Sequence, residues 1–180
     1  MSVSGQHRGF LHLLVVCALA GVAPSGATPL QAQAAGAASP PLGRAWVMQA
    51  GHWYTDVSGL VGAVRAELPL GNTGRWLLVP GVTYSHYTLG ASPTEIDLFA
   101  PEAVLQRQFG RGRIRPYVGG GAGLVLINMF HTVDPIFSLA GGLRADLGTQ
   151  WGARIELDTR AFGAFRAGAV GWSIGVARHF

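Results

Sequence analysis

The sequence predicts an all-β fold, an antiparallel, up-and-down transmembrane β-barrel of about eight strands, preceded by a signal peptide. Three observations predict it. Of the 180 residues, 49% are apolar and only 12% are charged, about half the charged fraction of an ordinary soluble domain. Glycine occurs 27 times, which suits tight turns and crowded strands better than helices. Apolar and polar residues also alternate along much of the chain with the period of two that is typical of strands.

The start of the chain has the layout of a secretory signal peptide. A short polar stretch containing Arg8 precedes the apolar run 10–23, and small residues then lead to Ala32-Gln33-Ala34, an A-x-A cleavage site. The run is shorter than the roughly 20 residues of a membrane-spanning helix, which favours cleavage over an uncleaved anchor. The only cysteine, Cys17, lies inside this run. We therefore expect residues 1–34 to be removed, leaving a mature chain with no disulfide and no thiolate metal site.

The mature part shows strand-like segments and no helical span. Its most apolar run, 118–130, is interrupted by four glycines and makes a poor helix. We expect 35–43 to be a disordered lead-in and 44–180 to form the barrel. Pro80 and Pro101 fall inside predicted strands, where each removes a ladder hydrogen bond, so bulges are expected there. The eight strands are predicted at about 44–54, 58–69, 75–87, 95–109, 113–128, 136–147, 152–162 and 168–180.

In three of these segments, 60–68, 137–147 and 152–161, the charged residues are spaced two apart and so share one face of the strand. If lipid lies on the opposite face, these charges point into the barrel together. An eight-stranded barrel has a lumen just wide enough for side chains to fill, which favours a salt-bridged interior over a pore or a ligand site. The predicted lumen charge network is Arg65, Glu67, Arg144, Asp146, Arg154, Glu156, Asp158 and Arg160, and Glu102 has the same character. Flanking arginines favour ionised carboxylates, so no catalytic proton donor is expected among them.

The last predicted strand favours a membrane over water. It places the small residues Ser173, Gly175 and Ala177 on one face and large apolar residues, ending in an aromatic one, on the other. The apolar face consists of Trp172, Ile174, Val176 and Phe180. Aromatic residues also lie near the predicted strand ends, as expected of interfacial girdles, namely Trp46, Trp53, Trp76, Tyr84, Tyr87, Trp151 and Trp172.

The A-x-A site, the segment Arg115-Pro-Tyr-Val-Gly-Gly-Gly-Ala-Gly123 and the terminal Phe180 resemble small outer-membrane β-barrel proteins, the OmpA-like and OmpX-like eight-stranded domains. The resemblance implies a monomer in the outer membrane of a Gram-negative cell envelope, in contact with outer-membrane lipid. It implies a structural, adhesion-related or porin-like narrow-channel role. The apolar face of the last strand resembles the signal by which the barrel-assembly machinery recognises its clients. Arg178 departs from this pattern by placing a charge on that face, where it would snorkel to the interface.

Other function classes find less support. The 13 arginines are spread out and form no basic stripe with interleaved aromatics, so no nucleic-acid partner is expected. The histidines lack metal-ligand spacing, and the glycines of 119–123 lack the Gly-Lys-Ser/Thr of a phosphate loop, so neither metal nor cofactor is expected. Ser85-His86 hints at a hydrolase, but the His-x-Ser pair of lipid A deacylases is missing. We expect no catalysis. A lipid-modifying outer-membrane enzyme and a soluble secreted barrel that binds an apolar ligand are the alternatives.

Overall fold

Eight antiparallel strands close into a barrel in the computed structural model, which describes residues 43–55, 58–88, 95–128, 132–163 and 167–180. The expected signal peptide, its cleavage site and most of the lead-in lie outside these residues. The strands are β1 (Ala45–Tyr54), β2 (Ser58–Leu70), β3 (Trp76–Thr88), β4 (Glu95–Gln108), β5 (Ile114–Ile127), β6 (Thr132–Asp146), β7 (Trp151–Phe162) and β8 (Ala167–His179). Among the described residues, no helix is long and apolar enough to cross a membrane.

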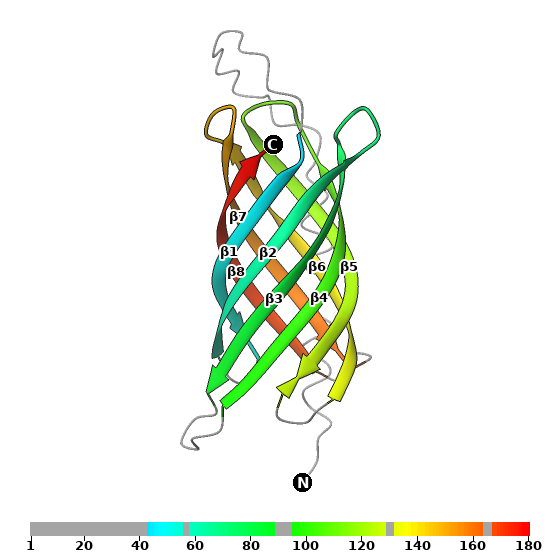
Figure 1. Ribbon diagram of the computed structural model, residues 1–180, viewed down its shortest axis with the longest axis vertical. Helices are drawn as coiled ribbons and strands as arrows, with labels where there is room; N and C mark the ends of the chain where they lie inside the picture. The colour runs from blue at the N-terminus through cyan, green and yellow to red at the C-terminus, as the bar shows by residue number, and fades with distance from the viewer. Residues whose placement is uncertain (1–42, 56–57, 89–94, 129–131, 164–166) are drawn as a thin grey trace, which may run out of the picture. The chain divides into compact units, whose positions relative to one another are not determined.

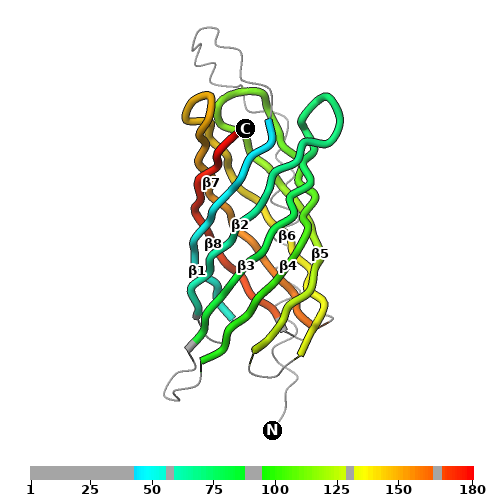
Figure 2. Tube along the Cα trace, viewed as in Figure 1, coloured from blue at the N-terminus to red at the C-terminus, as the bar shows by residue number. Residues whose placement is uncertain are grey.

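Each strand pairs with the next along the chain, and β1 pairs with β8 to close the barrel (Figures 1 and 2). The predicted fold class is therefore confirmed, and seven of the predicted strands begin and end within one residue of the observed ones. The exception is β6, which begins at Thr132 rather than at about 136. Closure removes every sheet edge, so all backbone groups of the strands can pair without water.

The two ends of the barrel differ, and we name them by what they carry. The terminal end holds the start of β1, the end of β8 and the turns after β2, β4 and β6, and it is uppermost in Figure 1. Gly71 and Gly110 in two of these turns have φ of 70° and 81°, a left-handed conformation that glycine adopts without strain. The opposite end, which carries the other four connections, is the loop end.

The prolines are accommodated without the expected bulges. Between β2 and β3 the register continues unchanged from Arg65↔Gly81 to Leu68↔Leu78, on either side of Pro80. Between β4 and β5 it continues unchanged from Phe99↔Leu126 to Glu102↔Gly123, across Pro101. Each proline therefore interrupts one ladder locally while the strand keeps its phase. The bulge expectation was wrong because the loss of a single N–H donor does not require an extra residue.

Apolar side chains cover the exterior and charges fill the interior, the inverse of a water-soluble barrel. On β7, Ile155 and Leu157 are 49% and 66% exposed, whereas Arg154 and Glu156, which alternate with them, are 5% and 1% exposed. The same alternation resolves the three strands whose facing the sequence left open. Val47 on β1, Val104 on β4 and Tyr117 on β5 point inward. An apolar exterior of this kind matches lipid rather than water.

Candidate functional site

The lumen contains one continuous chain of alternating charges that runs through five arginines and five carboxylates. It uses residues of β2, β4, β5, β6 and β7, so it crosses the interior rather than following one strand. Every member is at least nine-tenths buried in its side chain. In order from the loop end to the terminal end, its members are Asp158, Arg160, Glu102, Arg65, Glu156, Arg154, Glu67, Arg144, Asp146 and Arg115.

Glu156 is the centre of this charge chain. Its carboxylate accepts hydrogen bonds from Arg65 Nη1 at 2.7 Å, from Arg154 Nη2 at 2.8 Å and from the Tyr117 hydroxyl at 2.9 Å. Arg154 also donates to Glu67 at 3.2 Å, so a single guanidinium joins β7 to β2 across the lumen. Charge-assisted bonds of this kind are about twice as strong as neutral ones. The equal numbers of cations and anions leave the lumen without net charge.

Towards the loop end, Glu102 connects two arginines. Arg160 Nη1 lies 2.9 Å from Glu102 and Arg65 Nη2 lies 3.4 Å from it, while Arg160 also donates to Asp158 at 2.7 Å. The Arg160 guanidinium further lies 4.1 Å from the ring centroid of Trp53. A cation that is both ion-paired and stacked on an aromatic ring is fixed in position, as expected of a packed interior rather than a mobile pore lining.

Glycines make the room that these long side chains need. A Cβ at Gly81 would lie 2.5 Å from Arg65 Cγ, and one at Gly142 would lie 2.6 Å from the Tyr117 hydroxyl. Both distances are far below van der Waals contact, so any other residue would displace the charge chain. Part of the high glycine content therefore follows from the width of the lumen, where a long side chain on one strand faces a missing one on its neighbour.

All eight residues of the predicted lumen network belong to the charge chain, together with Glu102. Arg115 is a member of the charge chain that the predicted network does not include. It points into the barrel and pairs with Asp146. Tyr117, two residues further, faces the same way. Both residues could have been predicted from their spacing of two on β5. The glycines that follow have no side chains, so they do not show which face continues this alternation.

An apolar plug closes the lumen at the loop end. It is a cluster of buried residues, namely Trp53, Val61, Tyr87, Ala100, Val125, Ile136, Phe162 and Ala169. Trp53 and Tyr87 are each 2% exposed, so their assignment to the exterior girdle was wrong. The other predicted girdle residues do face outward, Trp76 and Tyr84 among them. Between plug and charge chain, a lumen cavity of about 10 Å³ is bounded by Gln49 and Ser173, among others. Such a cavity holds at most one water molecule.

A second polar group lies outside the barrel, near the loop end. Asp97 on β4 accepts a hydrogen bond from the Tyr84 hydroxyl at 2.6 Å, and its Oδ1 lies 3.0 Å from His86 Nδ1 on β3. His86 and Asp97 are 37% and 38% exposed in their side chains. Local sequence patterns do not predict this group, because His86 and Asp97 meet only through the register of β3 and β4. Within the described residues, no group of three or more acidic, cysteine or histidine side chains could hold a metal ion.

The predicted assembly face lies on the exterior of β8. Trp172, Ile174 and Val176 are exposed, and Phe180 stacks on Trp46 with ring centroids 6.2 Å apart. The Phe180 N–H donates to the Arg44 carbonyl at 2.9 Å, which ties the chain end to the residue before β1. The terminal aromatic residue therefore lies at the seam where the barrel closes.

Comparison with known proteins identifies relatives of the fold alone. No protein-family model matches the chain, and no curated protein matches it either. Among solved structures, Neisserial surface protein A aligns with a TM-score of 0.58 and 13% identity, covering 76% of this chain and 96% of that one. The outer membrane enzyme PagL aligns with a TM-score of 0.53 and 13% identity, covering 76% and 99%. The N-terminal β-barrel domain of Pseudomonas aeruginosa OprF gives 0.50 and 16%, covering 76% and 97%. With its closed sheet, inverted polarity and these neighbours, the chain has the fold of the small eight-stranded outer-membrane β-barrels.

Proposed function

We propose that this chain is a monomeric outer-membrane β-barrel with a closed lumen and a structural role in the cell envelope, without catalysis. The observation that carries the proposal is the double filling of the lumen, by the charge chain and by the apolar plug. An interior packed in this way leaves no path for solutes, which argues against a channel. The lumen cavity between the two fillings, about 10 Å³, is too small for an apolar ligand, which argues against a soluble carrier.

The loops at the loop end support a structural rather than an adhesive role. The longest connection there, between β3 and β4, has six residues, 89–94. Specific protein–protein interfaces usually engage about 20–30 residues on each side. We place the terminal end in the periplasm, because the longest connection, 89–94, belongs to the loop end and the outer loops of such barrels are the longer ones.

Two measurements on the same preparation test this proposal. Membrane fractionation with a heat-modifiability gel is expected to place the folded protein in the outer membrane. Planar-bilayer recording of the purified barrel is expected to give no ion current above that of the protein-free bilayer. Stable single-channel steps would contradict the closed lumen, and recovery in the soluble periplasmic fraction would contradict the membrane barrel.

Hydrolysis of a membrane lipid is the second candidate function, and the His86–Asp97 pair favours it. A carboxylate that accepts the Nδ1 proton leaves the other imidazole nitrogen as an acceptor, the arrangement of a general base. On the lipid-facing side, such a base would take a proton from a water that attacks an ester carbonyl. The C–O bond to the alcohol then breaks, the imidazolium returns the proton to the leaving alkoxide, and a fatty acid and an alcohol are released. In vesicles of phospholipid and lipopolysaccharide, we expect mass spectrometry to detect no released fatty acid. Release that is lost in His86→Ala would instead establish the enzyme.

A further inference from the structure

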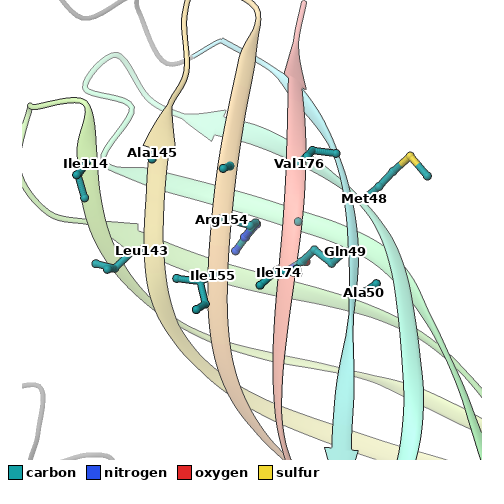
Figure 3. A pocket seen from close by; sticks show the side chains of 12 residues that line it. Met48, Gln49, Ala50, Ile114, Leu143, Ala145, Arg154, Ile155, Ile174 and Val176 are labelled. Carbon is teal, nitrogen blue, oxygen red and sulfur yellow. The ribbon is translucent and has the colours of Figure 1, made fainter.

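The exterior of the barrel is hollowed on one side, near the terminal end. A groove of about 690 Å³ crosses β5, β6, β7, β8 and β1. Its outward-facing lining is apolar throughout and includes Ile114, Leu143, Ile155, Ile174 and Val176, which Figure 3 shows in two rows. The groove is open to the surroundings rather than enclosed, so it suits a chain that lies along the barrel surface.

The groove arises from two small residues that face each other. Ala145 on β6 pairs directly with Ala153 on β7. On one side Ala145 pairs with Ile114, and on the other Ala153 pairs with Val176. The two alanines therefore form a floor between larger walls. Lipid tails are as apolar as these side chains, so the shape of the groove alone gives little preference for one lipid over another.

Arg178 supplies a charge at the mouth of the groove. It follows Val176 by two residues on the exterior of β8 and is exposed. It lies in register between Trp151 of β7 and Trp46 of β1, and its guanidinium carbon is 5.8 Å from the Trp151 ring centroid. Among the residues that the structure describes, no carboxylate lies within ion-pair distance of it. A guanidinium that lies beside interfacial tryptophans, with no described carboxylate in reach, is suited to bind a phosphate.

The charges of the whole terminal end favour an anion at this position. The carboxylates described near that end, Glu67 and Asp146, are buried in the lumen and paired with arginines. The exposed charges there are all arginines, namely Arg44, Arg75, Arg107, Arg111, Arg113 and Arg178. At the loop end, by contrast, Glu95 and Asp97 lie on the exterior. Among the residues that the structure describes, the exposed positive charge is thus concentrated around the terminal end rather than spread over the barrel.

From this geometry we propose that the groove binds an anionic glycerophospholipid of the periplasmic leaflet, with an acyl chain over Ala145 and Ala153 and the phosphate on Arg178. The proposal rests on the membrane location and the orientation proposed above. The groove accommodates the acyl chain, and Arg178 favours a headgroup with a net negative charge. A phosphatidylcholine has the same chains but no net negative charge, so it tests the second contribution separately.

The test is native mass spectrometry of the purified barrel in detergent, titrated with phosphatidylglycerol or with phosphatidylcholine of matched acyl chains. The wild type is expected to retain one phosphatidylglycerol about fivefold more tightly than phosphatidylcholine, the preference that one interfacial arginine provides. Arg178→Gln should remove this preference, while Ala153→Leu should weaken both lipids by filling the groove. The matched controls, Arg107→Gln on the same rim and Ala122→Leu on the exterior of β5, should bind as the wild type does.

Equal binding of the two lipids by the wild type would overturn the proposal, as would Arg107→Gln acting as strongly as Arg178→Gln. Heat-modifiability gels on every variant show whether the barrel is folded. A folded, outer-membrane-located barrel without lipid preference would contradict this inference alone, whereas a protein absent from the outer membrane would contradict the proposed function.

Discussion

The lumen is filled in two different ways, and the two fillings place different demands on the sequence. The plug at the loop end consists of apolar side chains such as Val125 and Ile136, which need only volume and shape. The charge chain needs every partner, because a buried charge without its counter-ion is far more costly than a small void. The plug should therefore tolerate trimming, and the charge chain should not.

The largest loss in the free energy of unfolding is expected from Glu156→Ala. This change leaves Arg65, Arg154 and Tyr117 without their shared acceptor, and removing one partner of a buried ion pair costs about 3–5 kcal/mol. Urea unfolding in lipid vesicles measures the free energy. The matched control is Ile155→Ala, one position away on the exterior, where acyl chains fill the gap. Equal destabilisation by the two variants would show that Glu156 is not held in a dry, paired interior.

A smaller loss is expected from Arg115→Met at the end of the charge chain. Its partner Asp146 keeps Arg144, whose Nε lies 3.6 Å away, so no charge is left isolated. We expect about 1.5–3 kcal/mol, the contribution of a hydrogen bond to a charged group. The same urea titration compares it with Glu156→Ala. If Arg115→Met destabilised the barrel as much as Glu156→Ala, a residue's position in the charge chain would not determine how much its loss costs.

A conservative change in the plug, Ile136→Val, is expected to reduce the free energy of unfolding less than either change in the charge chain. Removing one methyl from this fully buried side chain should cost about 0.5–1.5 kcal/mol. The control is Ile155→Val, the same chemical change on the exterior, which should leave the free energy of unfolding nearly unchanged. A loss at Ile155 as large as that at Ile136 would mean that the exterior is packed like a core.

The smallest effect on stability, with a larger one on assembly, is expected from deleting Phe180. The residue contributes one exposed stacking contact with Trp46 and one backbone hydrogen bond to Arg44 at the end of the barrel, so the folded barrel should lose little free energy. If the terminal aromatic completes the assembly signal, the outer-membrane yield should fall and aggregate should appear in the periplasm, as immunoblots of the fractions would show. Unchanged yield would mean that the residue is dispensable for insertion.

The sequence predicted the strands and the facing of β2, β6 and β7 well, because their charged residues are spaced two apart and alternate with apolar ones. It failed where that signal is weak or ambiguous. Arg115 was left out of the predicted network because the glycines at 119–121 carry no facing information for that strand. Trp53 and Tyr87 looked like girdle residues because an aromatic residue near a strand end suits either the interface or the plug. The His86–Asp97 contact depends on the register between two strands, which local patterns do not specify.

The most direct test of the central claim, that the apolar face meets lipid while the charges lie inside, is the environment of Leu157. The only native cysteine, Cys17, lies in the expected signal peptide, so Leu157→Cys gives the mature chain a single site for a nitroxide label. Paramagnetic resonance on the barrel in lipid vesicles then compares collisions with oxygen, which concentrates in lipid, and with a water-soluble nickel complex. If Leu157 faces lipid, we expect the label to collide frequently with oxygen and rarely with the nickel complex. Frequent nickel collisions and few with oxygen would show that this face meets water, which would contradict the membrane barrel.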